Sequence, residues 1–141
     1  MIDLFTYGSL MCSDIINKVA GCRLDFCQAR LNGYFRSNIR DKEYPGISPR
    51  SGAMVPGVLY LDLSPEAIER LDVFEGELYR RQVVEVVTEH HGLVKAMAYV
   101  IKPQHRDLLT NIEWDFNYFL AFGKKKFEET YFGFQDCQGI E

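Results

Sequence analysis

The sequence lacks the long hydrophobic runs and the basic surplus that mark two large classes of protein. No stretch approaches the ~20 apolar residues of a membrane-spanning helix, and no basic segment precedes an apolar one at the N-terminus, which argues against a signal peptide. The formal net charge is −4, from 16 Lys and Arg against 20 Asp and Glu. Nucleic-acid-binding domains usually carry excess positive charge. We therefore expect neither a membrane nor a nucleic acid as partner.

Cysteine and histidine are too few and too scattered for the usual metal sites. Cys12, Cys22, Cys27 and Cys137 form no C-x-x-C pair, and only three histidines could complete a ligand set. A chain of 141 residues without a secretion signal seldom depends on disulfides. We expect reduced thiols, a cytoplasmic location and no metal.

What the sequence does contain is typical of one folded domain. Hydrophobic residues make up 47% and charged residues 26% of the chain, and its length suits a single core. No linker, low-complexity segment or internal repeat divides it. We expect a single domain over residues 1–141.

Segments with strand-like patterns outnumber the helical ones, and short connections join them. Ser13 is the expected N-cap of the first helix, and Pro56-Gly57 indicates a sheet edge or a bulge within one strand. Because few helices alternate with the strands, we expect an α+β domain whose curled or closed sheet carries helices on its outside. The expected strands are 2–7, 29–35, 55–63, 79–88 and 93–101, the last two as a hairpin, and the expected helices are 13–19, 65–75 and the aromatic-rich 107–132.

Glu75 stands on an unexpected face of the predicted helix 65–75. Ser64 and Pro65 begin this helix as N-cap and first residue. At 100° per residue, Glu75 falls on the apolar stripe. A carboxylate aimed inward has to be paired, hydrogen-bonded or protonated. The stripe is formed by Ala67, Ile68, Leu71 and Phe74.

Three interpretations of Glu75 remain open from the helical pattern alone. The helix ends at Phe74 and Glu75 turns to solvent; Glu75 pairs with Arg80 or Arg81; or Glu75 is a general acid/base whose pKa its pocket raises. Asp72, at the edge of the stripe, is a weaker candidate for the same acid/base role.

A glycine turn follows the first predicted strand at Tyr7-Gly8-Ser9-Leu10. Glycine allows a positive φ or a close approach to a ligand, and successive amides in such a turn can bind an anion. An ordinary tight turn before a helix explains the motif equally well. It matches neither glycine-rich nucleotide signature, G-x-G-x-x-G or G-x-x-x-x-G-K-[ST].

Several motifs follow one another in a familiar order along about residues 2–87. They are LFTYGSL at Leu4–Leu10, GYFR at Gly33–Arg36 with YPGI at Tyr44–Ile47, VPGVLY at Val55–Tyr60, LDVFEG at Leu71–Gly76 and YRRQVVEV at Tyr79–Val86. Together they resemble the γ-glutamylcyclotransferase-like family, which includes γ-glutamylamine cyclotransferase and the plant avirulence-induced proteins. The resemblance becomes diffuse beyond Ile101.

The resemblance implies a small mixed β-barrel with flanking helices and a cavity at one end. It implies that Glu75 is the catalytic glutamate and that Tyr79 and Arg81, which match a Y-x-R signature, either touch the substrate or brace the cavity. The implied substrate-binding residues, which act through their main chain, are Tyr7, Gly8, Ser9 and Leu10.

The implied activity is the cleavage of a γ-glutamyl amide by its own α-amino group. This closes a lactam, 5-oxoproline, and releases an amine or an amino acid without metal, cofactor or water. The expected partner is thus a small γ-glutamyl compound, and the alternative is a non-catalytic small-molecule-binding or regulatory module on the same scaffold. We expect a monomer or a weak homodimer, with the aromatic tail in the core or in a dimer contact.

Overall fold

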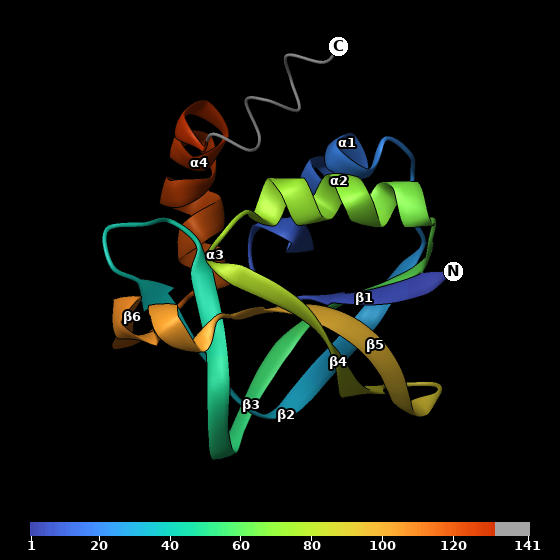
Figure 1. Ribbon diagram of the computed structural model, residues 1–141, viewed down its shortest axis with the longest axis horizontal. Helices are drawn as coiled ribbons and strands as arrows, with labels where there is room; N and C mark the ends of the chain where they lie inside the picture. Colours follow the sequence, from blue (N-terminus) through green and yellow to red (C-terminus); the bar gives the residue numbers. More distant parts are fainter. Residues whose placement is uncertain (132–141) are drawn as a thin grey trace.

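The computed structural model describes residues 1–131 as a curled sheet of six strands with helices packed on it (Figure 1). The expected α+β class, with a curled sheet and flanking helices, is confirmed. The strands are β1 (Ile2–Thr6), β2 (Phe26–Ile39), β3 (Pro45–Leu63), β4 (Tyr79–Thr88), β5 (Gly92–Ile101) and β6 (Leu109–Glu113). The helices are α1 (Ser13–Ala20), α2 (Pro65–Glu75), α3 (Phe116–Tyr118) and α4 (Lys124–Thr130), with 3₁₀ turns η1 (Ser9–Met11) and η2 (Pro103–Leu108) and a π-helical turn η3 (Phe119–Gly123).

The sheet is mixed and bends back on itself. Its strand order is β3-β1-β5-β4-β2-β6, and β3 also pairs with β2. Only β1 and β5 run parallel among the paired strands of residues 1–131, while the other pairs are antiparallel. β2 and β3 are much longer than expected, because they pair with each other from Phe26 opposite Tyr60 to Asn38 opposite Pro45, and the end of β2 also pairs with β6. The predicted hairpin of β4 and β5 is confirmed, with Tyr79 opposite Ile101 and Thr88 opposite Gly92.

The curled sheet separates two hydrophobic cores, and β1 contributes to both because its side chains alternate between the two faces. Leu4 belongs to the core beneath the helices, and the next residue, Phe5, belongs to the core inside the curl. α1 and α2 lie side by side over the first of these cores (Figure 1). The Arg70 Nε of α2 donates a hydrogen bond to the Ala20 carbonyl of α1 at 3.1 Å, which fixes the two helices together.

α2 forms as its sequence predicts. The Ser64 side chain accepts a hydrogen bond from the Ala67 amide at 3.1 Å, Pro65 occupies the first turn, and the helix ends at Gly76, whose φ is +78°. Glycine adopts this positive φ without steric cost, so the chain turns sharply after Glu75. The predicted apolar stripe is buried as expected; it comprises Ala67, Ile68, Leu71 and Phe74.

The prediction of a helix over residues 107–132 is confirmed for Phe116–Thr130 and wrong for Leu109–Glu113. Leu109–Glu113 instead forms β6, which pairs with the end of β2 at Ser37 and Ile39. Its β-branched residues suit a strand, and the helical turns begin only at Phe116. Phe132, the last residue of the predicted helix, lies outside the described residues, as does Cys137.

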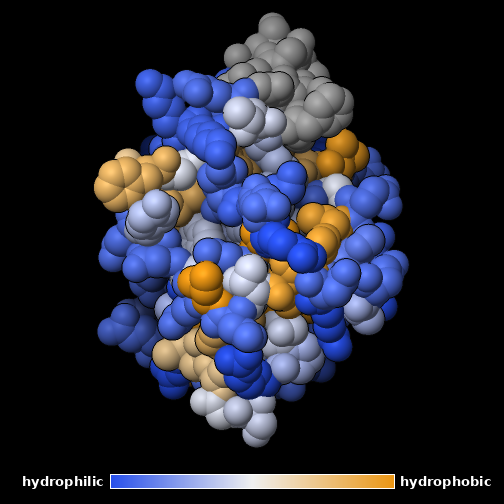
Figure 2. Space-filling view, turned by 90° about the vertical axis from the view of Figure 1, so that its left-hand side faces the viewer, coloured by the Kyte–Doolittle hydropathy of each residue, from blue (hydrophilic) through white to orange (hydrophobic). Residues whose placement is uncertain are grey.

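Aromatic residues after β6 divide between the core and the surface. Phe119 and Phe127 are buried, while the Tyr118 and Phe122 rings stand exposed with their centroids 5.0 Å apart. Figure 2 looks onto the side of the molecule that carries β6, where hydrophobic side chains form small separate patches among hydrophilic ones. The tail thus supplies part of the core, as predicted.

Two local predictions need correction. Cys12, not Ser13, occupies the N-cap of α1, and Ser13 is the first helical residue. The register of β2 and β3 runs unbroken through Pro56-Gly57, so no bulge lies there; the pairing of β3 with β1 ends at Val58, which leaves the edge alternative. Gly57 is needed because a Cβ at this position would stand 2.1 Å from the Thr6 carbonyl oxygen of β1.

Within residues 1–131 none of the helices has the length and apolar character that crossing a membrane would require.

Candidate active site

A small cavity lies where the end of α2 meets the turn after β1. It encloses about 30 Å³, room for about one or two water molecules. Among residues 1–131, Glu75 is the only acidic or basic side chain in the lining of this cavity. The cavity is lined by Phe5, Thr6, Tyr7, Gly8, Ser9, Leu10, Tyr44, Pro45, Phe74, Glu75, Tyr79, Tyr99, Phe127 and Tyr131.

Glu75 faces this cavity from the last turn of α2. The helix includes Glu75, so it does not end at Phe74. The residue is half-buried, and no hydrogen bond or ion pair to its carboxylate is formed within residues 1–131. Burial, and secondarily the negative charge of Asp72, raises the pKa of Glu75 from 4.5 to about 8. Of the three interpretations that the sequence left open, the geometry favours the proton-exchanging carboxylate.

Phenol rings surround the Glu75 carboxylate. Burial comes first in raising the pKa of each phenol, and the charge of Glu75 raises each pKa further. These side chains therefore remain neutral at physiological pH and supply a weakly polar wall. The five residues are Tyr7, Tyr44, Tyr79, Tyr99 and Tyr131.

The turn after β1 presents its main chain to the cavity. The Gly8 carbonyl accepts a hydrogen bond from the Met11 amide at 2.9 Å, which closes the 3₁₀ turn η1. The amides of Gly8, Ser9 and Leu10 precede that bond and have no partner within the turn, as is usual at the start of a helix. Gly8 itself has a φ of −131°, so the turn does not use a positive φ. It needs glycine because a Cβ would stand 2.8 Å from Pro45 Cδ.

Buried polar contacts hold the same turn from behind. Arg36 Nη1 donates a hydrogen bond to the Tyr7 carbonyl at 2.8 Å, and its guanidinium lies 5.1 Å from the centroid of the Trp114 ring. The Tyr7 hydroxyl donates to the Tyr99 carbonyl of β5. Tyr7 is therefore held both at its main-chain carbonyl and at its side-chain hydroxyl, which fixes the start of the turn.

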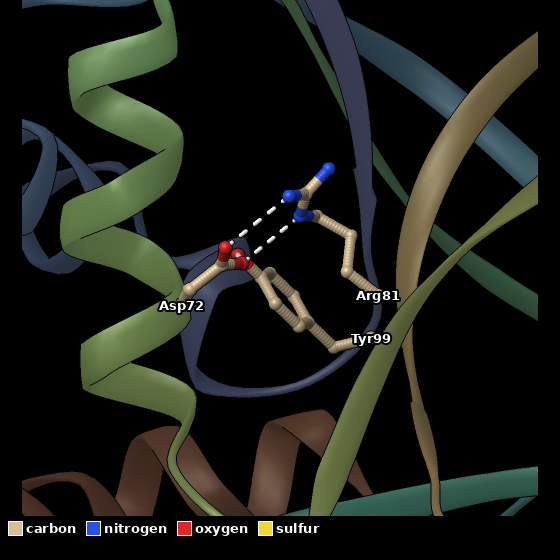
Figure 3. A network of polar contacts seen from close by, with 3 residues as sticks. All are labelled: Asp72, Arg81 and Tyr99. Atoms are coloured by element: carbon tan, nitrogen blue, oxygen red, sulfur yellow. Dashed lines mark hydrogen bonds and ion pairs between the residues drawn. The ribbon is translucent and has the colours of Figure 1, made fainter.

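Tyr79 and Arg81 take different positions. The Tyr79 hydroxyl lines the cavity and donates a hydrogen bond to the Pro45 carbonyl at 2.7 Å. Arg81 is not part of the lining; its Nε and Nη2 donate to the two Asp72 oxygens at 2.9 and 3.2 Å (Figure 3). Arg81 thus pairs with Asp72 and not with Glu75, whereas Arg80 is exposed.

Several residues of the site escaped the sequence-based prediction. Tyr44, Tyr99, Phe127 and Tyr131 are distant from Glu75 in sequence and belong to no motif with an assigned role. The Tyr131 hydroxyl donates to the Phe74 carbonyl at 2.6 Å, and its ring stacks on Phe127 with centroids 4.6 Å apart. The density of aromatic residues in the tail was the signal that could have indicated this wall.

Comparisons with known proteins agree with this architecture. The Arabidopsis thaliana "AIG2-like protein A" is 29% identical over 136 residues, which make up 96% of this chain and 82% of the relative. A solution structure of an Arabidopsis thaliana protein has a TM-score of 0.70 at 28% identity, covering 97% of this chain and 92% of that one. A solved "Gamma-glutamyl cyclotransferase" shares the fold, with a TM-score of 0.62 at 19% identity over 99% of this chain and 88% of that one.

The family described as "Gamma-glutamyl cyclotransferase, AIG2-like" matches residues 4–116, which include the turn after β1, all of α2 and both strands of the hairpin. The resemblance drawn from the motifs is thereby confirmed. The chain belongs to the AIG2-like γ-glutamyl cyclotransferase family.

Proposed function

We propose that the protein is a γ-glutamyl cyclotransferase that cleaves a γ-glutamyl amide by intramolecular aminolysis, with Glu75 as general acid/base. The products are 5-oxoproline and an amine or an amino acid. The proposal rests on the Glu75 carboxyl, which lines the same cavity as the turn after β1 and whose pKa burial raises to about 8.

The reaction is a proton transfer coupled to the exchange of one C–N bond for another. Ionised Glu75 takes a proton from the α-ammonium group of the substrate, and the freed nitrogen attacks the γ-carbonyl carbon. The new C–N bond closes the five-membered ring and leaves the attacking nitrogen with one surplus proton. Protonated Glu75 gives its proton to the leaving nitrogen and takes the surplus proton from the ring nitrogen, and the amide C–N bond then breaks to give the neutral lactam. The released amine takes the last proton from Glu75, which returns the carboxyl to its ionised form. Such general acid–base assistance contributes roughly 10²–10⁴-fold. A pKa of about 8 suits both directions of transfer.

The turn after β1 supplies fixed donors for this reaction. In this proposal the amides of Gly8, Ser9 and Leu10, residues that line the cavity, hold the substrate's α-carboxylate or the developing oxyanion. Holding the folded γ-glutamyl chain near its attack geometry is worth up to ~7–11 kcal/mol in ideal cases. Ser9 acts here as a hydrogen-bonding residue, and the mechanism needs no nucleophile from the protein.

Substrate binding requires the cavity to widen. A space of about 30 Å³ holds water but not a γ-glutamyl group. Its outer wall consists of the stacked rings of Phe127 and Tyr131, with Tyr44 against both. Outward movement of this wall is the step that would admit the substrate, since the opposite wall is made of sheet and α2.

The direct test is a panel of γ-glutamyl amines and γ-glutamyl amino acids, with 5-oxoproline as the measured product. We expect release of 5-oxoproline from at least one member, and none from the same compound with its α-amino group acetylated, because that nitrogen cannot attack. Release of free glutamate would indicate hydrolysis and contradict cyclisation. Binding of these compounds without any 5-oxoproline would favour the non-catalytic module.

A further inference from the structure

Asp72 lies one helical turn before Glu75 on α2 but outside the cavity lining. Its carboxylate accepts hydrogen bonds from two different strands (Figure 3). Arg81 of β4 donates through Nε and Nη2 at 2.9 and 3.2 Å, and the Tyr99 hydroxyl of β5 donates at 2.7 Å. Asp72 therefore has three donors, whereas Glu75 has none within residues 1–131.

We propose that Arg81, Asp72 and Tyr99 form a positioning cluster beside Glu75 that sets the proton affinity of its carboxyl. Residues three apart on a helix are neighbours on its surface, so the Asp72 and Glu75 carboxyl groups interact electrostatically. Two charge-assisted hydrogen bonds from Arg81 hold the Asp72 carboxylate in place beside Glu75. A fixed negative charge beside a second carboxyl favours the protonated form of that second group.

Arg81 and Asp72 act on Glu75 with opposite signs. The negative charge of Asp72 makes Glu75 harder to ionise, and the positive charge of Arg81 offsets part of that effect. Both side chains keep some contact with solvent, at 29% exposure for Arg81 and 41% for Asp72. Solvent screening weakens each effect, so we expect shifts of about half a pH unit to one pH unit.

Within the described part of the chain, the other titratable groups that face Glu75 are phenols, which carry no charge near neutral pH. Each element packed around it contributes a phenol: the turn after β1, the loop before β3, β4, β5 and the end of α4. Among residues 1–131, Asp72 is the charged group whose field raises the pKa of Glu75. The phenols are Tyr7, Tyr44, Tyr79, Tyr99 and Tyr131.

The test is an NMR titration of the Glu75 carboxyl in the full chain labelled with ¹³C-glutamate. The Glu75 signal is the one that disappears in Glu75→Gln. We expect Asp72→Asn to lower the titration midpoint by about half a pH unit or more and Arg81→Gln to raise it by a similar amount. Arg81→Lys keeps the charge and should stay nearer the wild-type midpoint than Arg81→Gln does.

Matched controls separate this local effect from net charge. Glu69→Gln removes one negative charge from an exposed position of the same helix, and Arg80→Gln removes one positive charge from the neighbouring exposed position of β4. Both should leave the Glu75 midpoint within about 0.2 pH units of wild type, because exposed charges are screened. Shifts in the controls as large as those at Asp72 and Arg81 would overturn the proposal.

The titration needs no turnover, so it is independent of the proposed cyclotransferase reaction, although the catalytic consequence rests on that function. Unchanged midpoints, or shifts of the same sign in Asp72→Asn and Arg81→Gln, would overturn the cluster even in an active enzyme. If Asp72→Asn or Arg81→Gln fails to fold, the direction in which the other variant shifts the Glu75 midpoint still tests the proposal. Where 5-oxoproline release is measurable, the acidic limb of its pH profile should move with the same two signs.

Discussion

Replacing Glu75 with Gln should stabilise the protein, and the gain should grow with pH. The folded protein holds the Glu75 proton more tightly than the unfolded chain does, because the pKa is about 8 in the cavity against an ordinary 4.5. The contribution of Glu75 to the free energy of unfolding is therefore fully present below about pH 4.5 and is lost as the pH rises through about 8. Gln cannot ionise, so the variant does not suffer this loss.

The size of the effect follows from the two pKa values. At about 1.4 kcal/mol for each pKa unit, the gap between 4.5 and about 8 corresponds to roughly 5 kcal/mol at the alkaline limit. Glu75 keeps partial contact with solvent through the cavity, which screens the charge, so we expect about half of this. The variant should gain ~2–3 kcal/mol over wild type between pH 5 and pH 8.5.

Urea unfolding at pH 5, 7 and 8.5 measures this difference directly. Comparing the two proteins at each pH cancels the contributions of the other titrating groups to the free energy of unfolding. Glu69→Gln removes an exposed carboxyl from the same helix and serves as the control. A difference in the free energy of unfolding between wild type and Glu75→Gln that stays constant over this pH range would refute the idea that Glu75 retains its proton in the folded protein. So would an equal pH dependence in Glu69→Gln.

Three further substitutions test the surroundings of Glu75. Gly8→Val places a Cβ 2.8 Å from Pro45 Cδ and should raise the KM for a γ-glutamyl substrate at least tenfold by displacing the turn; an unchanged KM would remove the turn from the site. Tyr131→Ala should open the cavity to water and lower the NMR titration midpoint of Glu75, and an unmoved midpoint would show that this ring does not shield it. Leu71→Ala, at a position with 0% exposure, should cost about 2–5 kcal/mol in urea unfolding, and a cost under about 1 kcal/mol would contradict the packing beneath α2.

The position of Glu75 could be predicted from sequence because local rules determine it. Ser64 and Pro65 fix where α2 begins, and the 3.6-residue period then places Glu75 with Phe74 and Leu71 on the buried side. Gly76 ends the helix after Glu75, so the carboxyl stays in the last turn beside the cavity. The family motifs added the chemistry that the period alone could not supply.

The partners of Glu75 could not be predicted, because tertiary packing determines them. Arg81 was weighed as a partner of Glu75, yet the pairing of β4 with β5 brings it to Asp72 together with Tyr99. The wall that contains Tyr131 depends on a turn of chain more than 50 residues after Glu75 in sequence. A contact over that separation leaves no periodic signal in either segment.

The strand β6 escaped prediction for a related reason. The aromatic residues from Phe116 onward are spaced as in a helix, and the predicted helix was therefore begun too early, so that it included Leu109–Glu113. That segment pairs with the end of β2, whose length the sequence underestimated. An edge strand of five residues has too little pattern of its own to oppose a strong neighbouring one.

The role of Glu75 as the acid/base of a cyclotransferase is tested most directly by comparing 5-oxoproline release in wild type and Glu75→Gln on the same γ-glutamyl amide at pH 8. The substitution keeps the shape of the side chain and removes only its proton exchange. The account predicts that wild type releases 5-oxoproline and that the variant loses activity by at least ~10²-fold while remaining folded. A folded variant that keeps turnover within a few-fold of wild type would contradict it.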